Sequence, residues 1–346
     1  MSRRYETCVA YNSLFLPTFL REYPQRKRGH IFLGNPYAHY YREREQNAKW
    51  KNSFSKLWKS RSIDILKNSF MKYDTIIYLQ WGIGNQMFQY AYGRTLELQG
   101  KKVYFDTSFY HTHWGVATKR VFSLPAFRLR YWASWLFERP SFVQRTRYRG
   151  YRIKKWLQHL WYPDFHDGYW QSERYFRGSE PGIRQEFILK DPMGPQAQIW
   201  SEKISQNPGA ISLHIRRGDY VSHPRVRAYI TPCSQGYYRA AINFFQKTVS
   251  SPVFFIFSDD IEWAWEHLPL ENAYYVSSSD LRDYEELILM SQCAHHIIAN
   301  STFSWWGAWL DGRSDTIVIA PSQWTLRETS DMLGIIPPFW KQISSV

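Results

Sequence analysis

The sequence has few cysteines and no long apolar run. Its 346 residues include only three cysteines, Cys8, Cys233 and Cys293, and their spacing matches neither a disulfide framework nor a zinc site. No apolar stretch approaches the roughly 20 residues that cross a bilayer, and the N-terminus carries no recognisable signal peptide. We therefore expect a soluble, cytoplasmic protein without a transmembrane segment.

Three sequence signatures of nucleotide and metal sites are also missing. There is no G-x-x-x-x-G-K-[ST] phosphate loop, and Met87 occupies the third glycine position of a G-x-G-x-x-G motif. No two aspartates are separated by a single residue, and the nearest pair is Asp259-Asp260. The sequence therefore offers no Asp-x-Asp metal ligand, and we expect chemistry that requires no metal ion.

Acidic residues are outnumbered. The chain has 44 Lys and Arg against 30 Asp and Glu, which gives a net charge of +14. This balance favours anionic partners such as nucleic acid, a membrane surface or a phosphorylated small molecule. Residues 1–70 alone carry +9, so the remainder is only modestly basic. This distribution disfavours nucleic acid as a partner, although a basic single-stranded nucleic-acid-binding module stays open as an alternative. The basic surface of residues 1–70 would also allow peripheral contact with a membrane.

Strand and helix patterns alternate from residue 73 onward. The stretch "TIIYLQWGIGNQMFQYAYGRTLELQGKKVYFD" predicts a strand, a glycine turn, a helix and a second strand. The same rhythm returns after an expected linker at Lys190–Pro195, and it predicts parallel sheets covered by helices on both faces. The predicted strands are Thr75–Leu79, Val103–Phe105, Ala210–Ile215, Val253–Ser258, Ala273–Val276, His296–Ala299 and Thr316–Ile319, and the predicted helices include Gln86–Leu98, Tyr237–Val249, Tyr284–Cys293 and Ser304–Leu310.

Polar clusters follow three of these strands. Ligands of open parallel sheets bind beyond the carboxyl ends of the strands, so the clusters are candidates for one site. A guanidinium matches phosphate oxygens two at a time, and a helix N-terminus attracts anions. The clusters are Gly82–Gln86, the run His214-Ile215-Arg216-Arg217-Gly218-Asp219, and Asn300-Ser301-Thr302.

Two of these clusters also have a purely structural interpretation. Arg217 and Asp219 would neutralise each other in a surface network, and Ser301 or Thr302 would only cap a helix. The position at strand ends favours a phosphate-binding role for Arg216. We expect Trp305 and Trp306 to pack inside the protein rather than against a ligand.

Four stretches together resemble the bacterial α-1,2-fucosyltransferases of glycosyltransferase family 11. They are "GIGNQMFQYAYGRTL", "GYWQSERYF", "SLHIRRGDYV" and "ELILMSQCAHHIIANSTFSWWGAWL". The resemblance covers about residues 73–321 and implies an α/β fold of the GT-B type, in which two facing Rossmann-like domains enclose a central cleft. It divides the chain into a basic N-terminal extension (1–70), an acceptor domain (71–192) and a GDP-fucose-binding domain (193–346) whose last helix would cross back.

The resemblance also implies an activity. GDP-β-L-fucose would be the donor, and its fucose would pass to O2 of a terminal β-galactose with inversion and without a metal, in the synthesis of surface glycans such as O-antigen. A transferase that uses a different nucleotide sugar is the main alternative. Trp81 stands where the family usually has glycine, and Glu286 stands where it often has Asp.

Residue roles follow from the same resemblance. Arg216 would stabilise the leaving β-phosphate, and Glu286 would accept hydrogen bonds from guanine. Asp219 is the first candidate for the base that takes the acceptor proton; holding Arg217 is its alternative role, and Glu173 is a second candidate for the base. The residues assigned to the donor are Asn85, Gln86, His214, Arg216, Glu286, Asn300, Ser301, Thr302 and Phe303.

Overall fold

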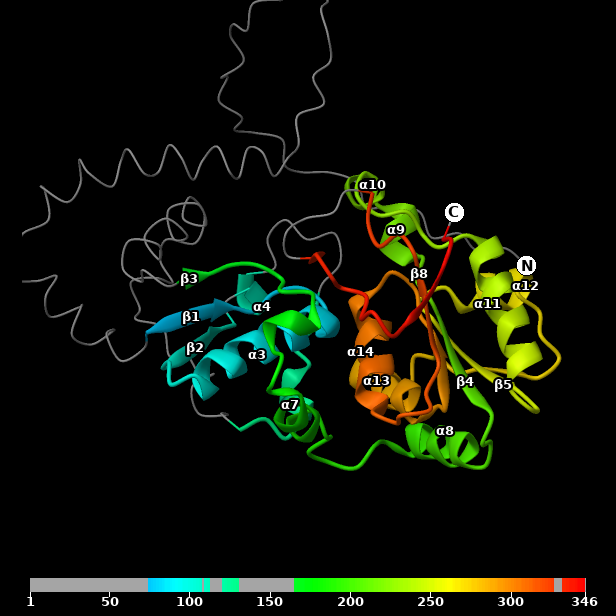
Figure 1. Ribbon diagram of the computed structural model, residues 1–346, viewed down its shortest axis with the longest axis horizontal. Helices are drawn as coiled ribbons and strands as arrows, with labels where there is room; N and C mark the ends of the chain where they lie inside the picture. The colour runs from blue at the N-terminus through cyan, green and yellow to red at the C-terminus, as the bar shows by residue number, and fades with distance from the viewer. Residues whose placement is uncertain (1–73, 108, 113–119, 131–164, 327–331, 346) are drawn as a thin grey trace, which may run out of the picture. The chain divides into compact units, whose positions relative to one another are not determined.

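A computed structural model describes residues 74–107, 109–112, 120–130, 165–326 and 332–345 (Figure 1). The predicted extension, residues 1–70, lies outside these ranges, so its proposed membrane contact stays a prediction. In the described part of the chain, no helix combines the length and the apolar character that crossing a bilayer requires.

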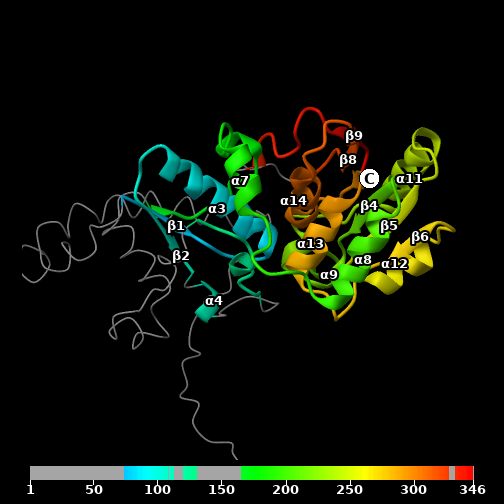
Figure 2. The same ribbon diagram turned by 90° about the horizontal axis from the view of Figure 1, so that it is seen from below.

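The first sheet contains three parallel strands in the order β2-β1-β3. The central strand β1 (Thr75–Tyr78) pairs with β2 (Val103–Asp106) and β3 (Phe165–His166). Helix α3 (Ile83–Leu98) connects β1 to β2 and covers one face of the sheet (Figure 2). The smaller elements of this part are α4 (Phe109–Thr112), the 3-10 turns η1 (Leu124–Ala126) and η3 (Glu173–Tyr175), and α7 (Glu180–Glu186).

The second sheet contains six parallel strands in the order β6-β5-β4-β7-β8-β9. Strands β4 and β5 are mostly apolar and almost completely buried, as expected for a parallel sheet covered on both faces. The strands are β4 (Ala210–Ile215), β5 (Val253–Ser258), β6 (Ala273–Tyr275), β7 (His295–Ile297), β8 (Val318–Pro321) and β9 (Lys341–Ile343).

Helices cover both faces of the second sheet. Alternate residues of β4 and β5 point to opposite faces, so Leu213 packs with α11 while Phe255 packs with α13 and α14. The helices are α8 (Pro195–Ser205), α9 (Gly218–Ser222), α10 (Pro224–Arg227), α11 (Gln235–Thr248), α12 (Ile261–His267), α13 (Asp283–Gln292) and α14 (Thr302–Asp311).

The predicted elements are present, and the α/β class with parallel sheets is confirmed. Each predicted strand overlaps an observed strand, and the two sets of strand ends differ by at most two residues. The sequence did not predict the elements α4, α8, α9, α10, α12, β3 and β9. The expectation of a final helix is wrong for the described residues 332–345, which contain β9 and no α-helix. Pro337 and Pro338 explain this, because proline lacks the N–H that a helix interior needs.

Helices α3 and α14 pack directly against each other. Trp306 Nε1 donates to Gly84 O at 3.0 Å, and the Phe88 ring lies 4.5 Å from the Trp305 ring and 4.9 Å from the Trp306 ring. Both tryptophans are fully buried, so the prediction that they pack internally is confirmed. Gly84 lies at the point of closest approach, where a Cβ atom would lie 2.5 Å from Thr302 C and 2.7 Å from Phe303 N.

We expect Gly84→Ala to destabilise the protein by about 1–3 kcal/mol, because a Cβ atom there meets main chain that cannot rotate away. Urea unfolding would measure the change in the free energy of unfolding. Gly182→Ala in α7 is the matched control, since nothing lies within 4 Å of its Cβ position. A Gly84→Ala protein as stable as the control would contradict the close contact between α3 and α14.

Candidate active site

Two helix N-termini meet at the centre of the candidate site. The N-cap of α14 is Ser301 and that of α3 is Gly82, and neither end receives a hydrogen bond from a side-chain cap. Within the described residues, the N–H groups of Thr302 and Phe303 have no hydrogen-bond acceptor. Unpaired N–H groups and the helix dipole make such an end an anion-binding position.

The Arg216 side chain lies beside this junction. Its Nη2 is 2.6 Å from Asp219 Oδ1 and its Nη1 is 3.0 Å from Asp259 Oδ2. Its guanidinium also lies 5.5 Å from the ring centroid of Tyr220, whose hydroxyl donates to Asn300 O at 3.0 Å. Burial alone would lower the pKa of Arg216, but the charges of Asp259 and its other neighbours raise it above its usual value. Arg216 is therefore a fixed cation next to the start of α14.

Arg217 does not pair with Asp219. Its Nε lies 3.0 Å from Asp260 Oδ2, its guanidinium covers the Trp263 ring at 4.0 Å, and its N–H donates to Asp259. The interpretation in which Arg217 and Asp219 neutralise each other is therefore wrong. Strand β4 ends at Ile215 and α9 begins at Gly218, so Asp219 lies in the first turn of α9 and pairs with Arg216, three residues earlier.

The two candidates for the base have different surroundings. Asp219 belongs to the site, but each of its oxygens accepts from a guanidinium: Oδ1 from Arg216 and Oδ2 from Arg120 at 2.7 Å. Glu173 accepts from Trp309 Nε1 at 3.1 Å, and Trp309 lies seven residues into α14, roughly 10 Å along the helix from its start. The structure therefore brings Asp219 to the site and leaves Glu173 outside it.

His214 is buried behind the start of α14. Its ring lies 5.4 Å from that of Phe303, and its Nδ1 has no hydrogen-bond partner within the described residues. Burial, reinforced by the charge of Arg216, lowers the pKa of His214 to about 3. The imidazole is therefore neutral at physiological pH and adds no positive charge to the site.

Glu286 lies in the first turn of α13, near Asp283 and Asp259. Desolvation is the main cause that raises the pKa of Glu286 to about 7. A hydrogen bond from the Ser277 side chain opposes the shift, and the two neighbouring carboxylates add to it. The adjacent Glu285 has a structural task, because it accepts from the N–H groups of Gly194 and Arg282. Of these two glutamates, only Glu285 is held by main-chain N–H groups in the described residues.

The structure gives two of the predicted donor-binding side chains internal roles. Gln86 is fully buried, donates to Trp81 O and Val121 O, and accepts from Ser123 N. The Asn300 amide donates to Thr231 O and Trp324 O. Both amides are therefore already used to hold loops in place, and this geometry favours positioning rather than direct contact with a ligand.

Asn85 lies in the first turn of α3. Its Oδ1 accepts from Gln171 Nε2 at 2.7 Å. Gln171 follows Trp170 in the "GYWQSERYF" stretch, and no pattern in that stretch indicated that its side chain would reach α3. Amides in such a pair retain hydrogen-bonding capacity that suits sugar hydroxyls.

Trp81 has a left-handed backbone conformation with φ of 70°. A side chain in this region costs roughly 1–2 kcal/mol, which agrees with the glycine expected at this position. Two hydrogen bonds to its carbonyl, from Gln86 Nε2 and Tyr110 Oη at 2.9 Å, hold the conformation. The loop between β1 and α3 is thus fixed from two sides.

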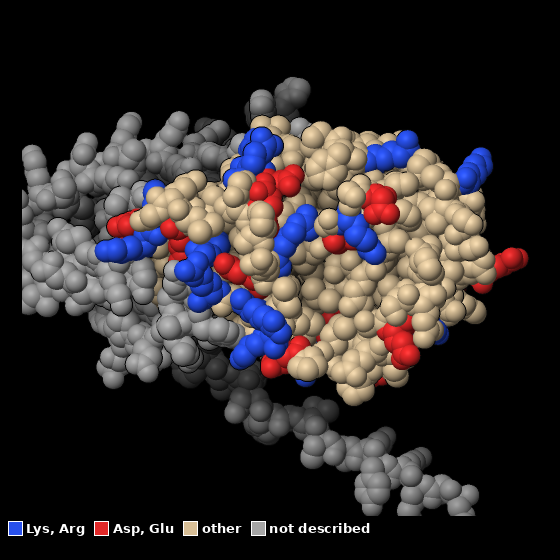
Figure 3. All heavy atoms as spheres, turned by 60° about the horizontal axis from the view of Figure 1, so that its bottom comes forward, with Lys and Arg blue, Asp and Glu red and all other residues tan. Residues whose placement is uncertain are grey.

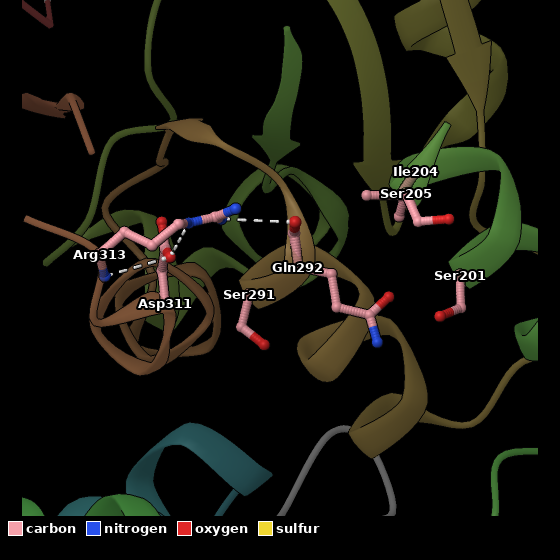
Figure 4. A pocket seen from close by; sticks show the side chains of 7 residues that line it. All are labelled: Ser201, Ile204, Ser205, Ser291, Gln292, Asp311 and Arg313. Carbon is pink, nitrogen blue, oxygen red and sulfur yellow. Dashed lines mark hydrogen bonds and ion pairs between the residues drawn. The ribbon is translucent and has the colours of Figure 1, made fainter. Parts of the chain in front are cut away.

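A pocket of about 560 Å³ opens at the C-terminal ends of α13 and α14, away from the candidate site (Figure 4). Arg313 reaches across it to Asp311 and to the carbonyl of Gln292. None of the predicted site residues lines this pocket, which is formed by Ser201, Ile204, Ser205, Ser291, Gln292, Asp311 and Arg313.

Charged residues are interspersed on the surface. On the face in Figure 3, basic and acidic side chains of the described residues alternate and form no continuous basic stripe. Such a stripe is what a single-stranded nucleic-acid-binding module requires.

Among the described residues, no group of three or more His, Cys, Asp or Glu side chains could hold a metal ion.

Comparison with known proteins adds independent information. The family model "Glycosyl transferase family 11" matches residues 42–340, and this match begins within the predicted N-terminal extension. The chain is similar to the alpha-1,2-colitosyltransferase of Escherichia coli, with 32% identity over 289 residues that cover 77% of this chain and 97% of the relative. It is also similar to galactoside alpha-(1,2)-fucosyltransferase 1 of Lagothrix lagotricha, with 27% identity over 278 residues that cover 76% and 71% of the two chains.

A solved structure of the fucosyltransferase NodZ from Bradyrhizobium matches 68% of this chain and 92% of its own, at 15% identity and a TM-score of 0.40. The family model, by contrast, spans most of the sequence, including all four stretches that carry the resemblance. The chain therefore belongs to glycosyl transferase family 11.

Proposed function

We propose that this glycosyltransferase moves L-fucose from GDP-β-L-fucose to O2 of a terminal β-galactose in a surface glycan such as O-antigen. The single observation that carries the proposal is that Tyr220 links the Arg216 guanidinium to Asn300, just before the unpaired N–H groups that begin α14. A fixed cation and a helix N-terminus on one site suit a nucleotide diphosphate as leaving group.

The proposed reaction is a single displacement with inversion. The acceptor O2 forms a bond to fucose C1 while the bond from C1 to the β-phosphate oxygen breaks, and GDP leaves with the electron pair. Arg216 and the N–H groups of Thr302 and Phe303 stabilise the charge that develops on the phosphate. The O2 proton passes to a base, for which Asp219 is the proposed residue once one of its two ion pairs opens. No step requires a metal ion.

The two sheets suit a GT-B arrangement, which we propose for the whole enzyme. The donor would lie at the carboxyl ends of β4 and β5, with guanine near His214 and Glu286. The acceptor would approach from the first sheet, past Asn85. The junction of α3 and α14 would then form the floor of the cleft between the two domains.

A second donor is supported by one of the relatives. The relative at 32% identity is named a colitosyltransferase, and the relative at 27% identity a fucosyltransferase. Colitose is fucose without its 3-hydroxyl group, so both donors would present the same GDP to the site. Discrimination between them would depend on side chains around the sugar, such as Asn85.

The direct test is to incubate the protein with GDP-fucose or GDP-colitose and a set of β-galactosides, and to determine the linkage of each product. We expect an α-1,2 linkage to galactose with GDP-fucose, formed equally well in excess EDTA. Transfer from GDP-colitose alone would replace the proposed donor. The absence of transfer from either donor, together with the absence of GDP binding, would overturn the proposal.

Arg216→Lys should lose about 10²–10³ in kcat, because lysine cannot make the two-pronged contact with phosphate that a guanidinium makes. Steady-state transfer assays would measure the loss, and circular dichroism would check the fold. Arg239→Lys, on the outer helix α11, is the matched control and should be unaffected. Normal turnover in Arg216→Lys would remove Arg216 from the mechanism.

Glu286→Gln should stabilise the unliganded protein above about pH 7 and weaken its binding of GDP. The pKa of Glu286 is about 7 in the folded protein against an ordinary value of 4.5. The unfolded chain therefore loses this proton more readily, so the cost of Glu286 to folding grows as the pH rises from about 4.5 to 7 and is complete above it.

Thermal unfolding at pH 5 and pH 8 would measure the first effect, and calorimetric titration with GDP the second. The stabilisation should be larger at pH 8 than at pH 5. If Glu286→Gln and the wild-type protein unfold at the same temperature at both pH values and bind GDP equally well, then Glu286 neither carries a desolvated charge nor contacts guanine.

A further inference from the structure

Arg120 reaches the candidate site from the first half of the chain. Its Nη2 lies 2.7 Å from Asp219 Oδ2, while Asp219 Oδ1 accepts from Arg216 Nη2 at 2.6 Å. One carboxylate therefore bridges two guanidiniums, one from each half of the protein. Nothing in the sequence singled out Arg120, because the residues around it show no regular pattern.

The segment that carries Arg120 is firmly held. The buried amide of Gln86 in α3 binds Val121 O, Ser123 N and Leu124 N. The Ser123 hydroxyl donates to Asp283 Oδ2 at 2.7 Å, which ties the segment to α13 near Glu286. Arg120 thus has a defined position beside the site.

The charges of the cluster leave a role for a second cation. Arg216 faces two carboxylates, Asp219 and Asp259, so its positive charge is offset before any ligand arrives. A nucleoside diphosphate brings more than one negative charge, and a second guanidinium beside Arg216 would balance it. Arg217 does not meet this need, since Asp260 and Trp263 engage it.

The two guanidiniums are accessible to a ligand. The side chains of Arg120, Arg216 and Asp219 are 23%, 21% and 18% exposed, so the cluster is open to solvent although much of it is buried. A phosphate oxygen can therefore replace a carboxylate oxygen on either guanidinium without unfolding the site.

We propose that Arg120 is a second diphosphate-binding residue, which contacts the terminal phosphate of the bound nucleotide from the first half of the protein. This inference rests on the proposed function. It makes neutralisation of the leaving group depend on both halves of the enzyme. As Arg120 turns toward the phosphate, Asp219 Oδ2 loses its partner, and this is the oxygen that the proposed base requires.

The test compares the affinities for GDP and GMP, because GMP lacks the β-phosphate, which is the terminal phosphate of GDP. We expect Arg120→Ala to weaken GDP binding by about 10- to 100-fold, the range for a hydrogen bond to a charged group. The affinity for GMP should change by less than about twofold. Calorimetric titration of the full-length protein would measure both affinities, and the rate of transfer should fall in parallel with GDP affinity.

Two further variants keep the test clear. Arg120→Gln preserves a hydrogen-bond donor for Asp219, so it separates loss of the cation from loss of the contact between the two halves, and we expect it to lose GDP affinity as Arg120→Ala does. Arg128→Ala removes an exposed guanidinium whose one hydrogen bond within the described residues goes to Leu189 O. This variant should bind both nucleotides normally.

The outcomes are distinct. Equal losses for GDP and GMP in both Arg120 variants, or no loss for either nucleotide, would overturn the role of Arg120 while the proposed function stands. A wild-type protein that binds neither GDP nor GDP-fucose would overturn the proposed function itself. A wild-type protein that prefers GDP to GMP, with a preference lost in Arg120→Gln, would support the inference.

Discussion

The contact between α3 and α14 is the constraint on which the rest of the site depends. A glycine at residue 84 lets the two helix N-termini meet, and the Trp306 indole fixes their alignment through the Gly84 carbonyl. Each helix follows a buried parallel strand, one from each sheet, so the contact joins the carboxyl edge of the first sheet to that of the second. The partial positive charges of two uncapped helices are thereby concentrated at one point.

In the described part of the chain, the three arginines near this point each have an anionic partner. Arg216 and Arg120 share Asp219, and Arg217 is held by Asp260 and Trp263. Carboxylates keep the guanidiniums in place in the absence of a ligand, at the cost of offsetting their charge. A diphosphate then exchanges one anionic partner for another, which requires less rearrangement than ordering mobile side chains.

Most of the fold was predictable from the sequence, because it depends on local patterns. The apolar runs of β4 and β5 and the start of α13 carry their own signals within a few residues. Helix α8 was missed, since its polar composition and the preceding Pro and Gly indicate a linker. Strand β3 has only two residues and depends on pairing with β1.

The site was predictable only in part. Arg216 and the beginning of α14 follow from strand ends and helix starts, which a sequence displays. The interpretation that paired Asp219 with Arg217 failed because α9 begins at Gly218, and Asp219 in its first turn binds Arg216 instead. The internal roles of Gln86 and Asn300 depend on carbonyls far along the chain, so their amides resembled ligand-binding groups.

Arg120 shows why the two halves must be considered together. Its importance comes from a contact with a residue 99 positions away, and no pattern in the sequence around it could indicate this. The segment that holds it is anchored to α3 by Gln86 and to α13 by Ser123. Any shift of one sheet against the other would therefore move Arg120 relative to Arg216. The charge that the site presents to a diphosphate is thus coupled to the packing of the two helices beneath it.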